Sequence, residues 1–446
     1  MPVTQPENRR PGVPHERAAL VGLVARRSRR TEAEHSLDEL AGLADAAGAT
    51  VALRMIQERP TPDPATFLGR GKLETLAAAC SEAGVNVVMV DNELTPAQLR
   101  QIEARLDCKV IDRTQLILDI FARRARTREG KWQVELAQLK YLLPRLIGAG
   151  AALSRLGGGI GTRGPGETKL ETDRRKIRQR IHTVTQDIDQ VRRRRQHLRS
   201  RRRKALIPTV ALVGYTNAGK TTLFNLLTRE SAEASDALFV TLDPLVRQVE
   251  LRDRRELLVS DTVGFIDRLP HTLVAAFRAT LEEVTEADLI LHVIDAASVD
   301  RERHMAAVGR VLEEVGASSV PVLDVFNKCD LLSPAVCERI GAAHPEALCI
   351  SALRGEGRQA LIDAVMARVA LDTRRVRLEF DSESAADRER IAGLYRQARV
   401  LSHVTRNGRA SIEADVPRRL LDRLTRSVQP VGRGKGDHAG APDGHA

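Results

Sequence analysis

The sequence lacks the long apolar runs that membrane-spanning helices require. Nothing in its 446 residues approaches the roughly 18 consecutive apolar residues of such a helix. Its five cysteines are scattered, odd in number and without the spacing of a metal site. This usage argues against a disulfide-built secreted domain and favours reduced thiols in a cytosol. The N-terminus is polar and proline-rich rather than a secretory signal, so we expect a cytoplasmic protein.

The charge of the chain is strongly unbalanced. Its formal net charge is +11, although its 29% charged and 42% hydrophobic residues are ordinary for a globular protein. Such a basic chain favours a polyanionic partner, either nucleic acid or an anionic membrane surface. The length predicts two to four domains with a large buried core.

The first part of the chain predicts a small α/β domain at residues 16–128, after a disordered tail at 1–15. Apolar strand-like runs alternate with helical ones, which is typical of a mainly parallel sheet. We expect strands at 18–24, 50–56, 85–90 and 110–111, and helices at 36–47, 71–83, 96–106 and 114–126. The basic residues of its loops, which together suit phosphate contacts, are Arg70, Lys72, Arg123, Arg124, Arg126 and Arg128.

Residues 129–204 predict an antiparallel helical hairpin, because apolar residues recur there at heptad spacing. Its second arm, 167–203, would be roughly 55 Å long, and Arg174 and Arg195 interrupt its apolar seam. Basic runs on this arm suit either a solvated face or a rod that faces RNA.

The tip of this hairpin, 157–167, is glycine-rich and contains G-x-G-x-x-G. No strand precedes it, so the dinucleotide-binding interpretation of that pattern is rejected. A flexible turn and a close backbone approach to phosphate, beside Arg155, Arg163 and Lys169, both remain open.

A phosphate-binding loop follows the apolar run 210–213. It fits the pattern G-x-x-x-x-G-K-[ST] and consists of Gly214, Tyr215, Thr216, Asn217, Ala218, Gly219, Lys220 and Thr221. Its glycines let backbone N–H groups turn toward a polyphosphate, and the next helix points its positive N-terminus at the same anion. Lys220 would reach the outer phosphates, and the Thr221 hydroxyl would hold Mg²⁺.

Two further segments predict the contacts to Mg²⁺ and to the γ-phosphate. An expected strand at 256–260 leads into a D-x-x-G motif formed by Asp261, Thr262, Val263 and Gly264. Asp261 would hold Mg²⁺ through water, and the Gly264 amide would contact the γ-phosphate. A switch segment precedes this motif and consists of Phe239, Val240, Thr241, Leu242 and Asp243. Its Thr241 would complete the Mg²⁺ shell.

The base-recognition residues follow two more expected strands. The strand at 320–326 ends in Asn327, Lys328, Cys329 and Asp330, and the strand at 347–350 ends in Ser351, Ala352 and Leu353. The Asp330 carboxylate can accept the N1 and N2 protons of guanine, which adenine does not offer in that arrangement. The backbone at 351–353 can contact the guanine O6. The order of the four motifs on strand ends therefore predicts a GTP-binding domain at 205–372.

This order resembles translation-factor-type GTPases, and the stretches 117–146 and 156–181 look like the HflX GTPases in particular. The resemblance implies GTP contacts at 214–221, 239–243, 261–264, 327–330 and 351–353, with Mg²⁺ on Thr221 and Thr241. It also implies binding to the large ribosomal subunit and its rRNA, in splitting, rescue or biogenesis. One departure is that the family pattern has threonines after Pro244, where this chain has Leu245 and Val246.

The predicted catalytic residues are Lys220, Thr241 and Gly264. Many related GTPases place a water-orienting glutamine after the D-x-x-G glycine, but this chain has Phe265. We therefore expect slow hydrolysis until the ribosome or a monovalent cation completes the site. Asn217 lies where an asparagine could hold K⁺, and a plain loop-stabilising amide is the other interpretation.

The predicted fold is thus a multidomain α/β chain whose P-loop GTPase domain precedes a small α+β domain at 373–428 and a disordered tail at 429–446. We expect a monomer. Two other functions stay open: an RNA-remodelling ATPase in the N-terminal domain, and a regulatory GTPase attached peripherally to a membrane.

Overall fold

The computed structural model describes residues 16–24, 30–154, 165–204, 207–228, 238–239, 241, 245–251, 256–267, 281–369, 371, 373–418, 420–421 and 424. The chain divides into two compact units. The first contains Met1–Arg201, Thr209–Arg247 and Leu258–Arg358, and the second contains Arg202–Pro208, Gln248–Leu257 and Gln359–Ala446. The predicted glycine-rich tip falls largely outside the described residues.

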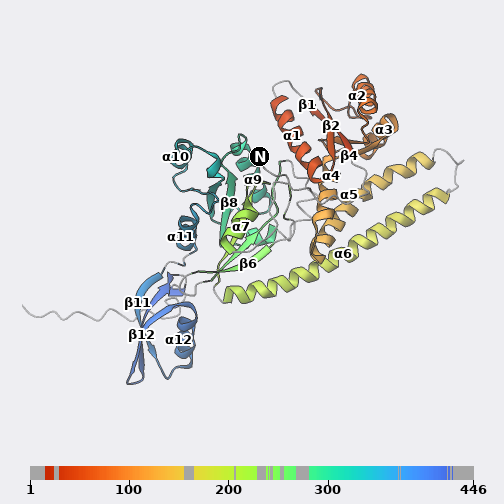
Figure 1. The fold of residues 1–446 in the computed structure, drawn as a ribbon. Helices are drawn as coiled ribbons and strands as arrows, with labels where there is room; N and C mark the ends of the chain where they lie inside the picture. The colour runs from red at the N-terminus through yellow and green to blue at the C-terminus, as the bar shows by residue number, and fades with distance from the viewer. Residues whose placement is uncertain are drawn as a thin grey trace, which may run out of the picture. The chain divides into compact units, whose positions relative to one another are not determined.

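The first unit begins with a parallel four-stranded sheet in the order β2-β1-β3-β4 (Figure 1). Its strands are β1 (Arg17–Val24), β2 (Thr50–Glu58), β3 (Val87–Val90) and β4 (Lys109–Asp112). The helices are α1 (Arg30–Ala46), α2 (Arg70–Ala83), α3 (Pro96–Leu106) and α4 (Arg113–Arg124). The predicted α/β fold is confirmed, although α1 begins at Arg30 rather than at residue 36.

This sheet is buried on both faces, as parallel sheets usually are. Successive residues of β1 point to opposite sides: Leu20 joins a core with α1 and α4, whereas Val21 joins a core with α2 and α3. The start of α3 follows from its sequence, because the Thr95 side chain and Gln98 form a reciprocal capping box before Pro96.

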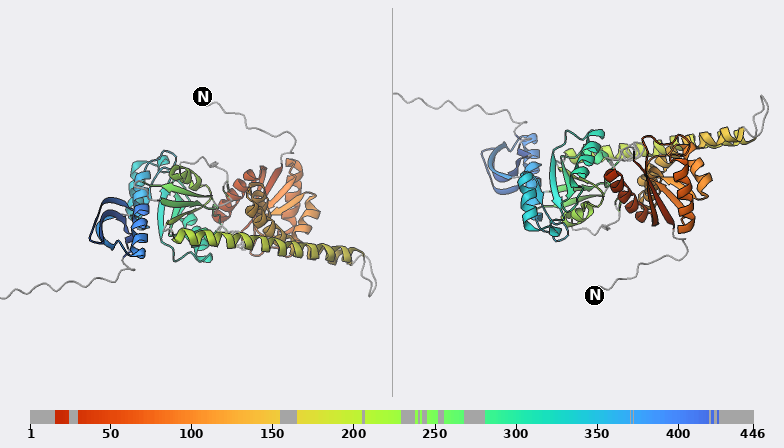
Figure 2. Two further views of the ribbon diagram at one scale, coloured as in Figure 1. Left: turned by 90° about the horizontal axis from the view of Figure 1, so that it is seen from below. Right: turned by 90° about the horizontal axis from the view of Figure 1, so that it is seen from above.

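The two long helices are α5 (Arg128–Ser154) and α6 (Pro165–Lys204), and Figure 2 shows α6 as one unbroken helix. Val184, one of the apolar residues at heptad spacing, is buried, while its polar neighbours Thr183 and Thr185 are exposed. Arg195, expected to interrupt the seam, instead forms an ion pair of 2.5 Å with Glu129 of α5. Arg180 pairs with Glu135 at 2.6 Å, so ion pairs supplement the apolar contact.

The second sheet has six strands in the order β10-β9-β8-β5-β7-β6. Its strands are β5 (Thr209–Gly214), β6 (Leu245–Glu250), β7 (Glu256–Asp261), β8 (Leu289–Asp295), β9 (Val322–Asn327) and β10 (Leu348–Cys349). The helices are α7 (Lys220–Thr228), α9 (Arg301–Glu314), α10 (Pro334–Ala343) and α11 (Arg358–Arg368). Strand β5 pairs in parallel with β7 and β8, and β9 pairs in parallel with β8 and β10. The carboxyl ends of these strands therefore share one edge, which is where ligands bind in such sheets.

One apolar cluster of the first unit joins the two sheets. It contains Leu40 and Phe121 from α1 and α4 together with Phe239 and Phe265, which the sequence places in the predicted nucleotide-contacting segments. The rings of Phe121 and Phe239 meet edge to face at 4.7 Å. The N-terminal helices thus pack directly against the segments that the sequence assigns to nucleotide binding.

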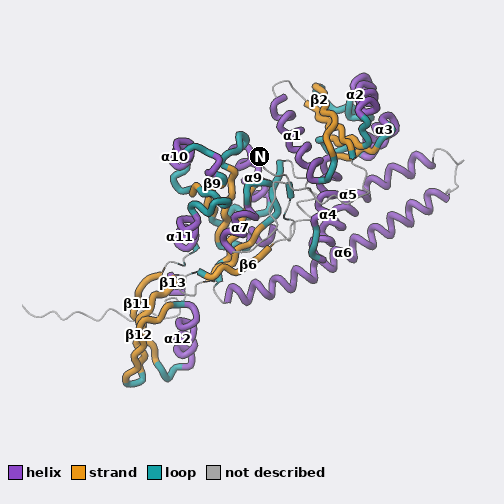
Figure 3. The backbone as a smooth tube through the Cα atoms, in the orientation of Figure 1, coloured by secondary structure: helices purple, strands orange, loops and turns teal. Residues whose placement is uncertain are grey.

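The second unit contains an antiparallel sheet in the order β11-β13-β12 with one helix against it (Figure 3). Its elements are β11 (Thr373–Asp381), α12 (Ala385–Gln397), β12 (Arg399–Arg406) and β13 (Arg409–Pro417). The turn between β12 and β13 is formed by Asn407 and Gly408, both at positive φ, as a two-residue hairpin requires. Its small core includes Phe380, Leu394 and Ile412.

Candidate nucleotide-binding site

The predicted phosphate loop connects the end of β5 to the start of α7. A Cβ on Gly214 would lie 2.2 Å from the Val293 carbonyl oxygen, and a Cβ on Gly219 would lie 2.2 Å from the Asn327 amide nitrogen. Gly219 also has a φ of +89°, where side chains are strained. Both glycines are therefore required by close packing, against the Val293 backbone at Gly214 and against the Asn327 side chain at Gly219. Asn217 at the tip is exposed and has a φ of 59°.

Lys220 is buried at the bottom of this loop, with only 6% of its surface exposed. Its ammonium donates to the Tyr215 carbonyl oxygen at 2.8 Å. Burial lowers the pKa of Lys220 to about 8, a shift that the nearby Asp261 carboxylate opposes. A phosphate anion at this position would supply the charge that the buried ammonium needs.

Three oxygen-bearing side chains meet beside the loop. The Thr221 hydroxyl lies 2.8 Å from the Thr241 hydroxyl and donates to Asp261 Oδ2 at 2.9 Å. Asp261 is fully buried, and its Oδ1 has no hydrogen-bond partner among the described residues. Burial raises the pKa of Asp261.

A hard divalent cation fits this position, because Mg²⁺ prefers hydroxyl, carboxylate, phosphate and water oxygens. Thr221 and Thr241 would hold the ion, with Asp261 behind them and its unpartnered Oδ1 available to a water ligand. The ion would neutralise phosphate charge during hydrolysis. The described residues contain no cluster of three or more His, Cys, Asp or Glu side chains with metal-binding geometry.

Asn327 links the predicted base-binding segment to the phosphate loop. Its amide donates to the Ala218 carbonyl oxygen at 2.9 Å, and its Oδ1 accepts from the Ala352 N–H at 2.9 Å. Nearby, the Ser351 hydroxyl donates to Asp330 Oδ1 at 2.6 Å. The Asp330 carboxylate is thus oriented from the end of the neighbouring strand, as a guanine-reading carboxylate would need.

Several predicted contact residues turn their side chains elsewhere. The Thr262 hydroxyl donates to the Leu212 carbonyl oxygen inside the sheet, and Val263 is buried in the core. The Cys329 thiol donates to the Phe326 carbonyl oxygen, whereas Leu353 is 79% exposed. Thr262, Val263 and Cys329 can therefore serve a nucleotide only through their backbone.

Lys328 has a structural role as well. Its φ is 64°, and its ammonium pairs with Asp295 at the end of β8 at 2.8 Å. The predicted residues Val240, Leu242 and Asp243 lie outside the described residues. Phe239 lies within them: it is buried, and its N–H donates to the Thr216 hydroxyl at 3.3 Å.

The segment after Asp261 lies tightly on the phosphate loop. A Cβ on Gly264 would be 2.9 Å from the Thr216 Cα and 3.1 Å from the Lys220 ammonium. Phe265 donates its N–H to the Gly214 carbonyl oxygen at 3.1 Å and accepts from the Thr216 N–H at 2.7 Å. Its ring is 2% exposed and packs in the core, so this position offers no group to orient a water molecule.

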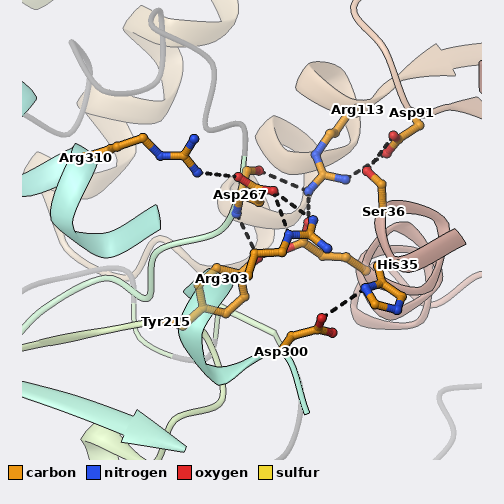
Figure 4. A network of polar contacts seen from close by, with 10 residues as sticks. His35, Ser36, Asp91, Arg113, Tyr215, Asp267, Asp300, Arg303 and Arg310 are labelled. Carbon is orange, nitrogen blue, oxygen red and sulfur yellow. Dashed lines mark hydrogen bonds and ion pairs between the residues drawn. The ribbon is translucent and has the colours of Figure 1, made fainter. Parts of the chain in front are cut away.

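Four further residues beside the loop lie outside all of the sequence motifs. Glu39 of α1 and the Asp267 N–H hydrogen-bond to the Tyr215 hydroxyl. Arg113 of α4 and Arg303 in turn bond to Asp267, as Figure 4 shows, and Arg113 also bonds to Glu39. Glu39 and Tyr215 lie 176 residues apart. No local spacing marks a contact of that separation, so the motifs could not predict it.

A phosphate loop, a D-x-x-G segment and an N-K-x-D segment at the ends of parallel strands define a GTPase of the P-loop class. Three family models match the chain: "GTP-binding GTPase N-terminal" at residues 34–122, "GTP-binding GTPase Middle Region" at 124–202, and "50S ribosome-binding GTPase" at 209–328. The chain belongs to the HflX family of GTPases, as its curated relatives show, and it is a GTP-hydrolysing enzyme.

Two of these relatives are similar over nearly their full length. The GTPase HflX of Caldanaerobacter subterraneus is 44% identical over 92% of this chain and 93% of its own. The GTPase HflX of Escherichia coli is 43% identical over 90% and 94%. A solved GTP-binding protein of Sulfolobus solfataricus in complex with GDP is 24% identical, with a TM-score of 0.41 over 79% of this chain and 98% of that one.

Proposed function

We propose that this GTPase binds the large ribosomal subunit and its rRNA, and that GTP hydrolysis times its association and release during ribosome splitting, rescue or biogenesis. The observation that carries the proposal is the exposed basic surface of α6. Its exposed basic side chains include Arg175, Lys176, Arg178, Arg193 and Arg194. Arg180 and Arg192 are exposed as well but form ion pairs with Glu135 of α5 and with Glu282. A long rigid helix with this charge suits contacts to an RNA backbone.

Support also comes from the whole chain. Its net charge is +11, and the family model that matches 209–328 is described as a 50S ribosome-binding GTPase. Among the described residues, every helix is too short or too polar to cross a membrane. We propose a cytoplasmic, monomeric protein in which 16–128 and 129–204 contact the ribosome, 205–372 binds GTP, and 373–428 forms a separate α+β domain.

We further propose that GTP occupies the strand-end site. Its phosphates would lie on 214–221 with Lys220, its Mg²⁺ on Thr221 and Thr241, and its γ-phosphate near Gly264. The base would contact 327–330 and 351–353, with 239–243 closing over the phosphates. Asn217, which is exposed at the loop tip, would hold K⁺ against the same phosphates.

Charge reversal on α6 tests the ribosome contact. In Arg193→Glu/Arg194→Glu, four units of charge change on exposed side chains, so affinity for purified large subunits should fall at least about tenfold. GTP affinity should stay within about twofold. A matched control is Arg374→Glu/Arg406→Glu, which makes the same charge change on exposed residues of β11 and β12. Equal loss in both variants, or none in the first, would contradict a contact through α6.

A further inference from the structure

Tyr215 has a role that its place in the phosphate-loop motif does not assign. Its hydroxyl donates to the Glu39 carboxylate. It also accepts from the Asp267 N–H at 2.8 Å, and Figure 4 shows Tyr215 and Asp267 side by side. Its ring stacks on His304 at 3.8 Å with an interplanar angle of 14°, and only 8% of the residue is exposed. A buried hydroxyl that both donates and accepts holds its two partners at a fixed separation.

Asp267 is fixed by its side chain and by both of its backbone polar groups. Its N–H bonds to Tyr215, its carbonyl oxygen accepts from Arg113 at 3.2 Å, and its carboxylate accepts from Arg303 at 2.8 Å and from Arg310 at 3.2 Å. Asp267 is therefore a fixed anchor at the end of the Gly264–Asp267 segment, and this segment packs against the phosphate loop.

This anchor lies three residues after Gly264, whose amide is proposed to contact the γ-phosphate. Gly264 packs against the Thr216 backbone so closely that a Cβ there would be 2.9 Å from the Thr216 Cα. Since three residues leave the chain little freedom, the position of the Gly264 amide depends on where Asp267 is held. Small displacements of a group that acts on the transition state lower the rate strongly.

Glu39 is itself oriented by the N-terminal helices. It pairs with Arg113, whose side chain is 4% exposed and also pairs with Asp91 at 2.9 Å. The Ser36 hydroxyl in turn donates to Asp91 at 2.6 Å. The hydroxyl of Tyr215 thus connects this buried network on α1 and α4 with the D-x-x-G segment.

We propose that Tyr215 is a positioning residue for GTP hydrolysis: its hydroxyl, oriented by Glu39, fixes the Gly264–Asp267 segment relative to the bound γ-phosphate. This role rests on GTP hydrolysis at the strand-end site and is independent of any ribosome contact. It predicts an effect on the chemical step rather than on nucleotide affinity, because Tyr215 would not touch the nucleotide through its side chain.

The test uses Tyr215→Phe in the full chain, with single-turnover hydrolysis and GTP affinity measured separately and without ribosomes. The hydrolysis rate should fall by about threefold to tenfold, the equivalent of one buried hydrogen bond, while the Kd for GTP stays within about twofold. Thr66→Val is the matched control. It also removes a buried hydroxyl that donates a hydrogen bond, to the Leu68 carbonyl oxygen at 2.8 Å, but it lies outside the network around Tyr215, and the hydrolysis rate of this variant should stay at the wild-type value.

Two Glu39 variants test whether hydrolysis depends on the side chain that accepts the hydrogen bond of Tyr215. Glu39→Gln keeps an oxygen for the Tyr215 hydroxyl and should retain most of the hydrolysis rate, whereas Glu39→Ala should lower it as Tyr215→Phe does. The double variant Tyr215→Phe/Glu39→Ala should be no slower than the slower single variant. An unchanged or raised rate in Tyr215→Phe, or a rate loss matched by weaker GTP binding, overturns the proposal. Absence of hydrolysis by the wild type would instead count against GTP hydrolysis at this site.

Discussion

The side-chain amide of Asn327 donates a hydrogen bond to the carbonyl oxygen of Ala218 at 2.9 Å. This contact ties the end of β9 to the phosphate loop, and the Asn327 Oδ1 also accepts from the Ala352 N–H. The segments proposed to contact the phosphates and the base are therefore held in one geometry by a single side chain that is 2% exposed.

Replacing Asn327 should weaken the binding of GTP and GDP alike. In Asn327→Ala, two buried backbone groups lose their partners, so the affinities for GTP and GDP should both fall by about tenfold to a hundredfold. Fluorescent-nucleotide titration measures both. The control is Asn86→Ala, which removes an exposed side-chain bond of 2.8 Å to the Arg17 N–H in the N-terminal sheet and should leave both affinities unchanged. A loss confined to GTP would show that Asn327 does not hold the shared part of the site.

Base selection should depend on Asp330. In Asp330→Asn, the new amide cannot accept the two guanine protons but can donate to the C2 carbonyl of xanthine. Preference should therefore shift from GTP toward xanthosine triphosphate, which competition between the two nucleotides measures. If the variant keeps the GTP preference of the wild type, the guanine contact lies elsewhere.

Nucleotide affinity should also depend on pH through Lys220. Burial lowers the pKa of Lys220 in the free protein to about 8, whereas bound phosphate favours its charged form. Below pH 8 the lysine is already protonated and affinity is constant. Above pH 8 binding must take up a proton, so the Kd for GTP should rise with pH.

The matched variant for this profile is Lys220→Arg, whose guanidinium stays charged across the range. It should bind more weakly but lose the pH dependence near 8. Deprotonation of guanine itself at higher pH would persist in the variant, so the comparison isolates the lysine. The same upward trend in both proteins would assign the effect to the nucleotide.

The rate of GTP hydrolysis should depend on potassium, and this dependence should require Asn217. The buried Phe265 offers no group that orients water, so a cation against the phosphates could supply missing positive charge. Hydrolysis in KCl should exceed hydrolysis in NaCl at equal ionic strength, and Asn217→Ala should remove the difference. Equal wild-type rates in the two salts would leave Asn217 as a loop-stabilising amide.

Local patterns in the sequence predicted most of this fold. The parallel strands follow from short apolar runs, and the phosphate loop follows from glycines whose packing the structure explains at Gly214 and Gly219. The hairpin turn at Asn407–Gly408 likewise follows from two residues that tolerate positive φ. Such signals work because each depends on the conformation of a few neighbouring residues.

Contacts between distant segments were not predictable in this way. The heptad pattern of α5 indicates one apolar seam, but the helix also buries Ala137 and Tyr141 in the core with α4. In the sequence, Arg195 is only an interruption of the apolar seam, because its ion-pair partner Glu129 is identified by the tertiary fold alone. The network around Tyr215 needs Glu39 and Asp267 in one place, which only the tertiary fold provides.

The measurement that tests the central claim most directly is co-sedimentation of the full chain with purified ribosomal subunits. Samples would contain GTP, GDP or a non-hydrolysable GTP analogue, at several salt concentrations. We predict binding to the large subunit rather than the small one, strongest with the analogue, weakest with GDP, and falling steeply with salt. Equal binding to the large subunit with GTP, GDP and the analogue would contradict the account. Co-sedimentation with anionic vesicles in place of large subunits would contradict it as well.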